Sequence, residues 1–196
     1  MILSVLYSLF GAAMRLYHPR FRVVGKENIP SEGAFLICAN HRGMADPLWI
    51  VIALRQHPLP RVMAKAVLLH IPVLGWLLRA IGVIGVRRGE SDLNAMKESL
   101  STLKNGRSLL IFPEGTRIKN GKKSEPKAGA LMLASRADVP ILPVYIETVR
   151  RPFSPMRCII GAPFRVTDGQ TKLTMEQRHR KTQELMQTIY QLGEAL

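Results

Sequence analysis

Three short apolar runs, each followed by polar residues, stand out in the first two thirds of the chain. They cover residues 33–39, 81–86 and 108–112. Unbroken apolar runs of this length are typical of strands buried on both faces of a parallel sheet, whereas strands with one solvated face alternate. The segments between the runs have helical spacing. The pattern therefore predicts a single α/β domain with a mixed, largely parallel sheet flanked by helices.

Helix start and stop signals fit this arrangement. Asp46 followed by Pro47 predicts a helix with Asp46 as N-cap and proline at the first helical position. A second helix is predicted from Ser91, as its cap, to a stop at Asn105-Gly106. Its apolar positions have helical spacing and are Leu93, Met96, Leu100 and Leu103.

The chain is predicted to close with a helix over residues 174–196. Thr174 and Gln177 have the spacing of a capping box. The apolar stripe of this helix comprises Leu185, Ile189, Leu192 and Leu196.

The N-terminal segment is apolar over residues 1–14, where only Ser4 and Ser8 are overtly polar, and Arg15 follows. A helix of this length spans about 21 Å, less than the ~30 Å hydrocarbon core of a bilayer. We predict a membrane-associating helix over residues 1–17 that enters one leaflet, followed by one domain over residues 18–196. The alternatives are a core helix and a cleaved signal peptide, although no positive charge precedes the apolar stretch.

A second apolar segment covers residues 67–78 and is interrupted by His70, Pro72 and Gly75. It could lie against the same membrane face, line a channel for an acyl chain, or belong to the core.

Composition limits the partners. The 196 residues suit one domain and include 28 Lys+Arg against 14 Asp+Glu, a formal charge of +14. Such a charge suits nucleic acid or an anionic membrane. With 6% aromatic residues and no RNA-module motif, the chain is predicted to meet membrane lipids and not nucleic acid. Two basic groups are candidates for that contact or for an ordinary solvated surface: Lys119, Lys122 and Lys123, and Arg150, Arg151, Arg157 and Arg165.

The two cysteines, Cys38 and Cys158, lie in apolar strands and are predicted to be reduced core residues of a cytosolic protein. Cys38 is three residues before His41, which raises a Cys/His thioesterase as an alternative. The strand direction, however, predicts that Cys38 points into the sheet. The remaining histidines have no partner that the sequence suggests: His18, His57, His70 and His179.

His41 and Asp46 are the first candidates for chemistry, because they lie in a turn after a predicted strand. A carboxylate bound to one imidazole nitrogen fixes the tautomer and stabilises the imidazolium. The other nitrogen can then take a proton from a substrate hydroxyl. The alternative is that Asp46 only caps its helix and His41 is a polar loop residue.

The polar residues that follow the three strands would share one rim if the strands are parallel, at the crevice where open α/β sheets bind ligands. These residues are His41, Arg87, Arg88, Glu114 and Arg117. No nucleophile elbow, Walker loop, Gly-x-Gly-x-x-Gly or metal-ligand cluster is present in the sequence. A His/Asp base beside a cationic patch suits deprotonation of a hydroxyl on an anionic, phosphorylated substrate.

The order of these motifs resembles that of the glycerolipid acyltransferases, and most of all the bacterial lysophosphatidic acid acyltransferases. Four blocks carry the resemblance: His41 with Asp46, the arginines after residues 81–86, residues 112–117 and residues 139–144. Shorter family-like segments are 64–65, 71–76 and 126–130, and the similarity runs from Phe21 to Phe164. Two arginines fall at the second block; Arg88 at its end is favoured, with Arg87 as the alternative.

The resemblance implies acyl transfer from an acyl thioester, acyl-CoA or acyl-ACP, to the sn-2 hydroxyl of lysophosphatidic acid, which gives phosphatidic acid. His41 would be the general base and Asp46 its orienting partner. The phosphate would lie against Arg117, Arg87 or Arg88, and Lys65. Glu114 and Gly115 would shape the glycerol site, and Thr116 would support the turn.

The same resemblance implies no metal and no cofactor beyond the thioester co-substrate. Backbone N–H groups near Gly43 or Gly115 are candidates for the oxyanion site. The enzyme would act at the cytoplasmic face of the cell membrane as a peripheral or monotopic protein. Two alternatives stay open: an acyltransferase for another lyso-lipid, such as a lyso-aminolipid, and a non-enzymatic membrane lipid-binding protein.

Overall fold

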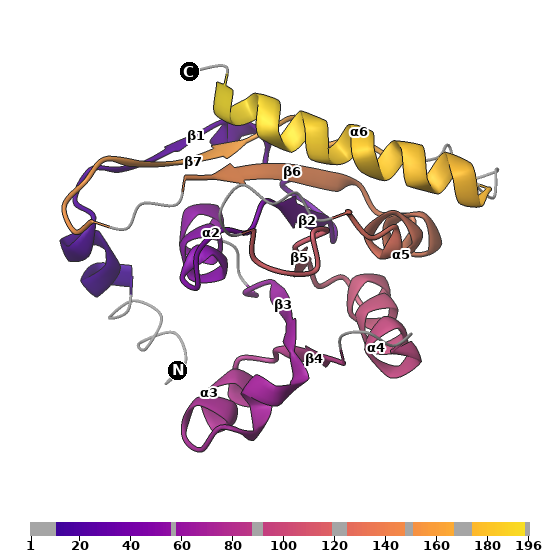
Figure 1. The fold of residues 1–196 in the computed structure, drawn as a ribbon, viewed down its shortest axis with the longest axis horizontal. Coiled ribbons are helices and arrows are strands. Elements are labelled where there is room, and N and C mark those ends of the chain that lie inside the picture. Colours follow the sequence, from indigo (N-terminus) through magenta and orange to yellow (C-terminus); the bar gives the residue numbers. More distant parts are fainter. Residues whose placement is uncertain are drawn as a thin grey trace.

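The computed structural model describes residues 11–55, 58–87, 92–118, 125–147, 151–166 and 174–194 (Figure 1). A helical segment at 11–17 precedes the named elements. These follow in the order β1 (Phe21–Val24), η1 (Lys26–Asn28), β2 (Leu36–Ala39), α2 (Asp46–Leu54), β3 (Arg61–Lys65), η2 (Ala66–His70), α3 (Leu74–Ala80), β4 (Ile84–Val86), α4 (Leu93–Lys104), β5 (Leu109–Ile111), α5 (Gly129–Ala137), β6 (Ile141–Ile146), β7 (Met156–Ile160) and α6 (Met175–Glu194).

The strands form one seven-stranded sheet in the order β1-β7-β6-β2-β5-β3-β4. Every neighbouring pair is parallel except β6 and β7, which are antiparallel. The predicted mixed, largely parallel sheet is thus confirmed, and the three predicted strands correspond to β2, β4 and β5.

The strand β2 lies at the centre of the sheet because both of its faces are apolar. Leu36 and Cys38 pack into the cluster beneath α4, α5 and α6, whereas Ile37 and Ala39 pack into the cluster beneath α2. Figure 1 shows these helices on opposite sides of the sheet, so the domain has three layers. Burial raises the pKa of the Cys38 thiol. This side chain belongs to the core and does not reach the crevice, which removes the basis for a Cys/His thioesterase.

The carboxyl ends of β2, β5, β3 and β4 lie along one edge, because these four strands are adjacent and parallel. The predicted rim is therefore real, but β3 adds a strand to it that the apolar pattern did not predict. Charged residues begin and end β3. Arg61 is accommodated there because its guanidinium donates to the carbonyl of Gly82 and to Thr102, and pairs with Glu98.

The predicted helix boundaries are closer to the observed ones than the predicted capping residues are. Asp92 caps α4 by accepting a bond from the Ala95 amide at 3.0 Å, so the expected cap at Ser91 is wrong by one position. Ser91 itself lies outside the described residues. Leu93, predicted on the apolar stripe, is instead 67% exposed because the helix begins there and turns it outward.

The capping box of α6 is confirmed in both directions. Thr174 N–H donates to the Gln177 side chain at 2.9 Å, and Gln177 N–H donates to the Thr174 hydroxyl at 3.2 Å. Leu185 and Ile189 are buried against the sheet. Leu196, the last residue of the predicted stripe, lies outside the described part of the chain.

The helical segment 11–17 lies at the start of the described chain, and residues 1–10 of the predicted membrane helix are outside it. Leu16 and Tyr17 are exposed, while His18 is buried. The sequence suggested no partner for His18, but its Nδ1 lies 3.0 Å from the Ser154 carbonyl and its ring meets Trp49 edge-on. Among the described helices, none is both long and apolar enough to cross a bilayer.

Only some members of the two predicted basic groups are among the described residues. Lys119, Lys122, Lys123 and Arg150 lie outside the described residues. Arg157 pairs with Glu147, and Arg165 pairs with Asp138 at 2.7 Å. The arginine group is therefore not a set of four unpaired cations.

Candidate active site

The chain leaves β2 through Asn40, a buried residue whose side chain extends the pairing of β2 with β6. Its amide donates to the Ile146 carbonyl at 2.9 Å and accepts from the Ile146 N–H at 2.8 Å. A side-chain amide can make both bonds at once because it carries the same donor and acceptor as a peptide group. The start of the next turn is therefore fixed to the centre of the sheet.

His41 and Asp46 contact each other across that turn. The imidazole Nδ1 lies 3.1 Å from Asp46 Oδ2, and the same oxygen accepts the N–H groups of Arg42 and Gly43 at 2.7 Å each. An acceptor-only carboxylate at Nδ1 favours the tautomer with hydrogen on Nδ1, which leaves Nε2 as the proton acceptor.

The prediction that Asp46 is the N-cap of α2 is wrong. The helix begins at Asp46 itself, with Ala45 at the cap position and no side-chain bond to the first helical amides. The carboxylate turns back into the loop because three donors meet it there. The structure thus favours the interpretation in which Asp46 serves His41 over the one in which it only starts a helix.

The segment after β5 surrounds His41. The ring of Phe112 stacks on the imidazole at a centroid distance of 4.1 Å. The Ile118 N–H donates to the His41 carbonyl at 2.8 Å, and the His41 N–H donates to Glu114 Oε2 at 2.9 Å. His41 is thus held in place by contacts to its ring, its backbone N–H and its backbone carbonyl.

Glu114 was predicted to line the glycerol site, but the structure turns its carboxylate inward. The side chain is 3% exposed, and its second oxygen accepts a bond from the Tyr190 hydroxyl. Burial raises the pKa of Glu114, while the bonds from Tyr190 and His41 act in the opposite direction. Burial, with the carboxylate opposite, raises the pKa of Tyr190 to about 12. In this position Glu114 supports the backbone of His41 from below the crevice.

Three of the predicted cationic residues can be placed on the rim. Arg117 directly precedes Ile118, which bonds to His41, and its half-buried side chain has no hydrogen-bond or ion-pair partner within the described residues. Lys65 ends β3, the neighbour of β5, and is exposed. Arg87 follows β4, one strand further out; adjacent strands lie about 4.8 Å apart, so it is roughly 10 Å from β5. Arg88 lies outside the described residues.

Gly115 has a backbone conformation that residues other than glycine rarely adopt, with φ of 65°. A Cβ there would lie 3.3 Å from the side chain of Lys127, which covers the turn. Thr116 is exposed beside it. The amide of Gly115 donates to the Phe112 carbonyl, and that of Gly43 donates to Asp46. Both N–H groups are therefore already bonded within the protein, so in this conformation neither is available to stabilise an oxyanion.

Sequence reasoning missed Asn40, Arg42 and Tyr190 as parts of this site. Arg42 lies over the Tyr190 ring at 5.5 Å from its centroid. Asn40 and Arg42 flank His41 in the sequence, which is a local signal. Tyr190 is 76 residues from its partner Glu114, and only the packing of α6 on the sheet brings the two together.

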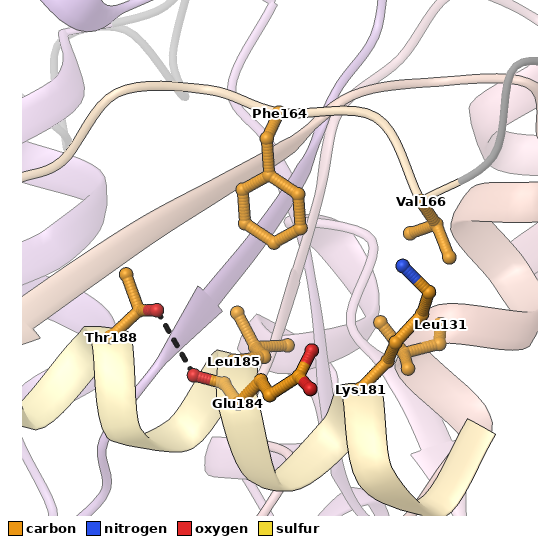
Figure 2. Close-up of a pocket in the computed structure, with 7 residues that line it drawn as sticks. All are labelled: Leu131, Phe164, Val166, Lys181, Glu184, Leu185 and Thr188. Carbon is orange, nitrogen blue, oxygen red and sulfur yellow. Dashed lines mark hydrogen bonds between the residues drawn. The ribbon is translucent and has the colours of Figure 1, made fainter. Parts of the chain in front are cut away.

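A half-open cavity of about 240 Å³ lies elsewhere, on the side of the sheet that α5 and α6 cover. Figure 2 shows its walls, which are Leu131, Phe164, Val166, Lys181, Glu184, Leu185 and Thr188. None of the candidate site residues contributes to it. Lys181 and Glu184 are the charged residues of its walls, whereas the His41–Asp46 pair and Arg117 lie at the rim, so the candidate chemistry belongs to the rim and not to this cavity.

The family model described as acyltransferase matches residues 20–147 of this chain. The matched range contains the whole rim, from His41 to Arg117. The chain belongs to the acyltransferase family.

Named relatives make the similarity more specific. The chain is 38% identical over 124 residues to the 1-acyl-sn-glycerol-3-phosphate acyltransferase of Borreliella burgdorferi. This alignment covers 62% of this chain and 49% of the relative. It is 31% identical over 125 residues to the chloroplastic 1-acyl-sn-glycerol-3-phosphate acyltransferase of Brassica napus, with 62% of this chain and 36% of the relative covered. The chain therefore spans between a third and a half of the length of these relatives.

A solved structure shares the fold. The crystal structure of the 1-acyl-sn-glycerophosphate (LPA) acyltransferase PlsC from Thermotoga maritima superposes with a TM-score of 0.72 at 27% identity. The match covers 96% of this chain and 78% of that one, so the similarity extends beyond the motifs to the whole architecture.

Proposed function

We propose that this chain is a 1-acyl-sn-glycerol-3-phosphate acyltransferase that moves an acyl group from a thioester to the free sn-2 hydroxyl of lysophosphatidic acid, giving phosphatidic acid for phospholipid synthesis. The observation that carries the proposal is the His41–Asp46 contact of 3.1 Å on a rim that also presents Arg117 and Lys65. The names of the relatives support the same acceptor.

The reaction needs one base and no covalent enzyme intermediate. His41 Nε2 takes the proton of the acceptor hydroxyl as its oxygen attacks the thioester carbonyl. The tetrahedral intermediate collapses, the carbon–sulfur bond breaks, and the departing sulfur takes the proton back from the imidazolium. Asp46 stabilises the imidazolium between the two steps. The donor thiol can be that of coenzyme A or of acyl carrier protein.

The cationic side chains of the rim would bind the phosphate of the acceptor. Arg117 is the best placed of them because it adjoins the segment bonded to His41 and its guanidinium is not committed to a described neighbour. Arginine presents paired donors that match phosphate oxygens. Lys65, with Arg87 or Arg88, would add charge from the outer strands.

The chain is further proposed to work as a peripheral or monotopic protein on the cytoplasmic face of the cell membrane, with residues 1–17 entering one leaflet. Met14 packs against the core cluster beneath α2, so a truncation that spares the domain should stop before it. Removing residues 1–10 should move protein from the membrane fraction to the supernatant while the circular dichroism spectrum is retained. A truncated protein that still sediments fully with membranes at high salt would place the anchor elsewhere.

The direct test of the activity is release of free thiol from acyl-CoA and acyl-ACP by the purified full chain, with and without acceptor. Lysophosphatidic acid should stimulate release, and phosphatidic acid should accumulate in equal amount. His41→Ala should lower turnover by about 10²-fold or more. His179→Ala, an exposed histidine on α6, is the matched control. A preference for a lyso-aminolipid would change the substrate, and thiol release that acceptor does not stimulate would refute the proposal.

A further inference from the structure

The segment that joins β3 to β4 exposes an unusual number of large apolar side chains. Together they form what is here called the η2–α3 surface. Val73 is 81% exposed and Trp76 66%, and Val67, Ile71, Leu74 and Leu77 are between 38% and 52% exposed. Soluble domains seldom leave such a contiguous apolar patch uncovered. Resting on the proposed function, we propose that the η2–α3 surface inserts into the membrane leaflet that contains the acceptor lipid.

Close contacts hold the η2–α3 surface in a shape that leaves its apolar side chains exposed. Gly75 packs so closely on Leu69 that an added Cβ would lie 2.1 Å from the Leu69 carbonyl oxygen, and a Cβ on Gly85 would lie 2.7 Å from Cδ1 of the Leu69 side chain. The Arg79 guanidinium donates to that same carbonyl. Val73 is held at φ of 62°, a conformation that β-branched residues rarely adopt, and projects outward.

Charge selects lipid as the occupant. From residue 60 to residue 89 the sequence has no aspartate or glutamate, while Lys65, Arg79 and Arg87 are exposed among the apolar residues. This combination of apolar, basic and tryptophan side chains suits the interface of an anionic leaflet. Helix α3 has seven residues, so the contact is shallow and does not span.

The position of the surface relative to the rim gives it a role. Lys65 directly precedes η2, and Figure 1 shows α3 projecting beyond β3 and β4, away from the helices that cover the sheet. Insertion at this place would hold the cationic rim at the depth of lipid phosphates.

Trp76 offers a direct readout because the only other tryptophan, Trp49, is buried. Fluorescence of the full chain in the Trp49→Phe background should shift to shorter wavelength with phosphatidylglycerol vesicles, and lipids brominated near the headgroup end of the acyl chain should quench it. If Trp49→Phe does not fold, the difference between wild type and Trp76→Phe gives the same signal. Emission that stays open to an aqueous quencher on bound vesicles would overturn the proposal, as would a shift caused by acyl carrier protein and not by vesicles.

Binding measurements add a second arm. The double substitution of Val73 and Trp76 by Asp should lower partition onto these vesicles by tenfold or more, about the effect of withdrawing one large apolar side chain from lipid. Leu93→Asp and Met175→Asp change equally exposed apolar residues on other elements and are the controls. Equal losses in all variants would overturn the assignment. These readouts need no turnover, so their failure is distinct from failure of the proposed reaction.

A separate observation concerns α6. The Tyr190 hydroxyl donates to Glu114, whose other oxygen accepts the His41 N–H at 2.9 Å. We infer that Tyr190 is a positioning residue, which sets the place of His41 through Glu114. The path consists of two hydrogen bonds to one buried carboxylate, so loss of the hydroxyl removes one of the bonds that hold Glu114 beneath His41.

Tyr190→Phe tests this inference, because it keeps the ring under Arg42 and removes only the hydroxyl. Tyr145→Phe is the matched control, since its ring on β6 lies 6.5 Å from that of Tyr190. In Tyr190→Phe, kcat should fall about tenfold with the acceptor KM unchanged, whereas Tyr145→Phe should match wild type. A rise in acceptor KM alone would contradict positioning and indicate a substrate contact.

The pH profile separates positioning from general stability. Within the described part of the chain, the charged and titratable groups that act on Glu114 include His41, Arg42 and Tyr190, and the bond from Tyr190 lowers the Glu114 pKa. Removing that bond should raise the Glu114 pKa, so the acid limb of the pH profile of kcat should move to higher pH. A lower unfolding midpoint with an unmoved acid limb and normal kcat would show that Tyr190 is only structural.

Discussion

At the scale of single residues, Asp46 shows why the local sequence could be interpreted in two ways. An aspartate before proline is typical of a helix start, yet three donors from the preceding loop compete for its carboxylate. The loop prevails because its two amides and the imidazole lie on the same side of Asp46, within 3.1 Å. The role proposed for Asp46 depends on accepting a hydrogen bond from His41 Nδ1.

Asp46→Asn should therefore damage turnover although the shape is kept. An amide can still accept one of the loop N–H bonds, but its NH₂ group facing the ring would favour the wrong tautomer of His41. We expect a loss of at least about 10²-fold in kcat, comparable to loss of the base itself. Steady-state kinetics of the purified variant provide the measurement. Asp138→Asn, on the surface, is the control, and a kcat within twofold of wild type for Asp46→Asn would exclude the assigned role.

Arg117 offers a second prediction at this scale. Because lysine cannot reproduce paired bonds to phosphate, Arg117→Lys should weaken use of lysophosphatidic acid even though the charge remains. The informative quantity is catalytic efficiency with lysophosphatidic acid divided by that with monoacylglycerol. Arg117→Ala should lower this ratio, since the second acceptor has no phosphate to lose. Arg165→Ala, which removes a surface pair, should leave it unchanged. A constant ratio in Arg117→Ala would move the phosphate site to Lys65, Arg87 or Arg88.

The predictable part of the site is the part encoded locally. Five residues separate His41 from Asp46, and a single turn can join them. Tyr190 and Glu114 meet only because α6 crosses the sheet after the chain has completed every strand. Nothing in the spacing of residues 174–196 marks Tyr190 apart from its neighbours, so packing alone gives it a place in the site.

At the scale of elements, the side chain of Asn40 is the link between β2 and β6. Asn40→Ala would leave the buried N–H and C=O of Ile146 without partners, which costs about 1–3 kcal/mol. We expect the free energy of unfolding, measured by urea denaturation, to fall by this amount. Asn105→Ala, where the lost bond is exposed and 3.3 Å long, should change stability far less. Equal effects of the two substitutions would show that the Asn40 bonds contribute little.

The strands differ in how well the sequence predicts them. The run at residues 33–39 predicts β2 because a central strand has no polar positions. The strand β3 begins with Arg61 and ends with Lys65, so it carries no such run, and its arginine is compatible with a sheet only because Gly82, Thr102 and Glu98 receive it. A strand stabilised by distant partners is not visible in local hydropathy.

At the scale of the whole molecule, parallel pairing brings together residues that lie far apart in the chain. The rule that ligands bind at carboxyl ends of such sheets predicted the rim from three strands, and the family match over residues 20–147 contains all of it. The order of strands was not predictable from the runs. It places β3, which ends in Lys65, next to β5, and β4, which precedes Arg87, one strand further out.

The excess charge of +14 leads to a prediction for the molecule as a whole. Binding to vesicles that contain phosphatidylglycerol should weaken as KCl rises from 0.05 to 0.5 M, because the screening length falls from roughly 14 Å to about 4 Å. Binding to neutral phosphatidylcholine vesicles should be weaker at low salt and nearly independent of KCl, since only apolar insertion remains there. Sedimentation with vesicles at matched lipid concentration measures both, and potassium sulfate at equal ionic strength controls for a specific effect of chloride. If the anionic vesicles showed no salt dependence, the basic surface would have no part in membrane contact, and apolar insertion would have to account for all of it.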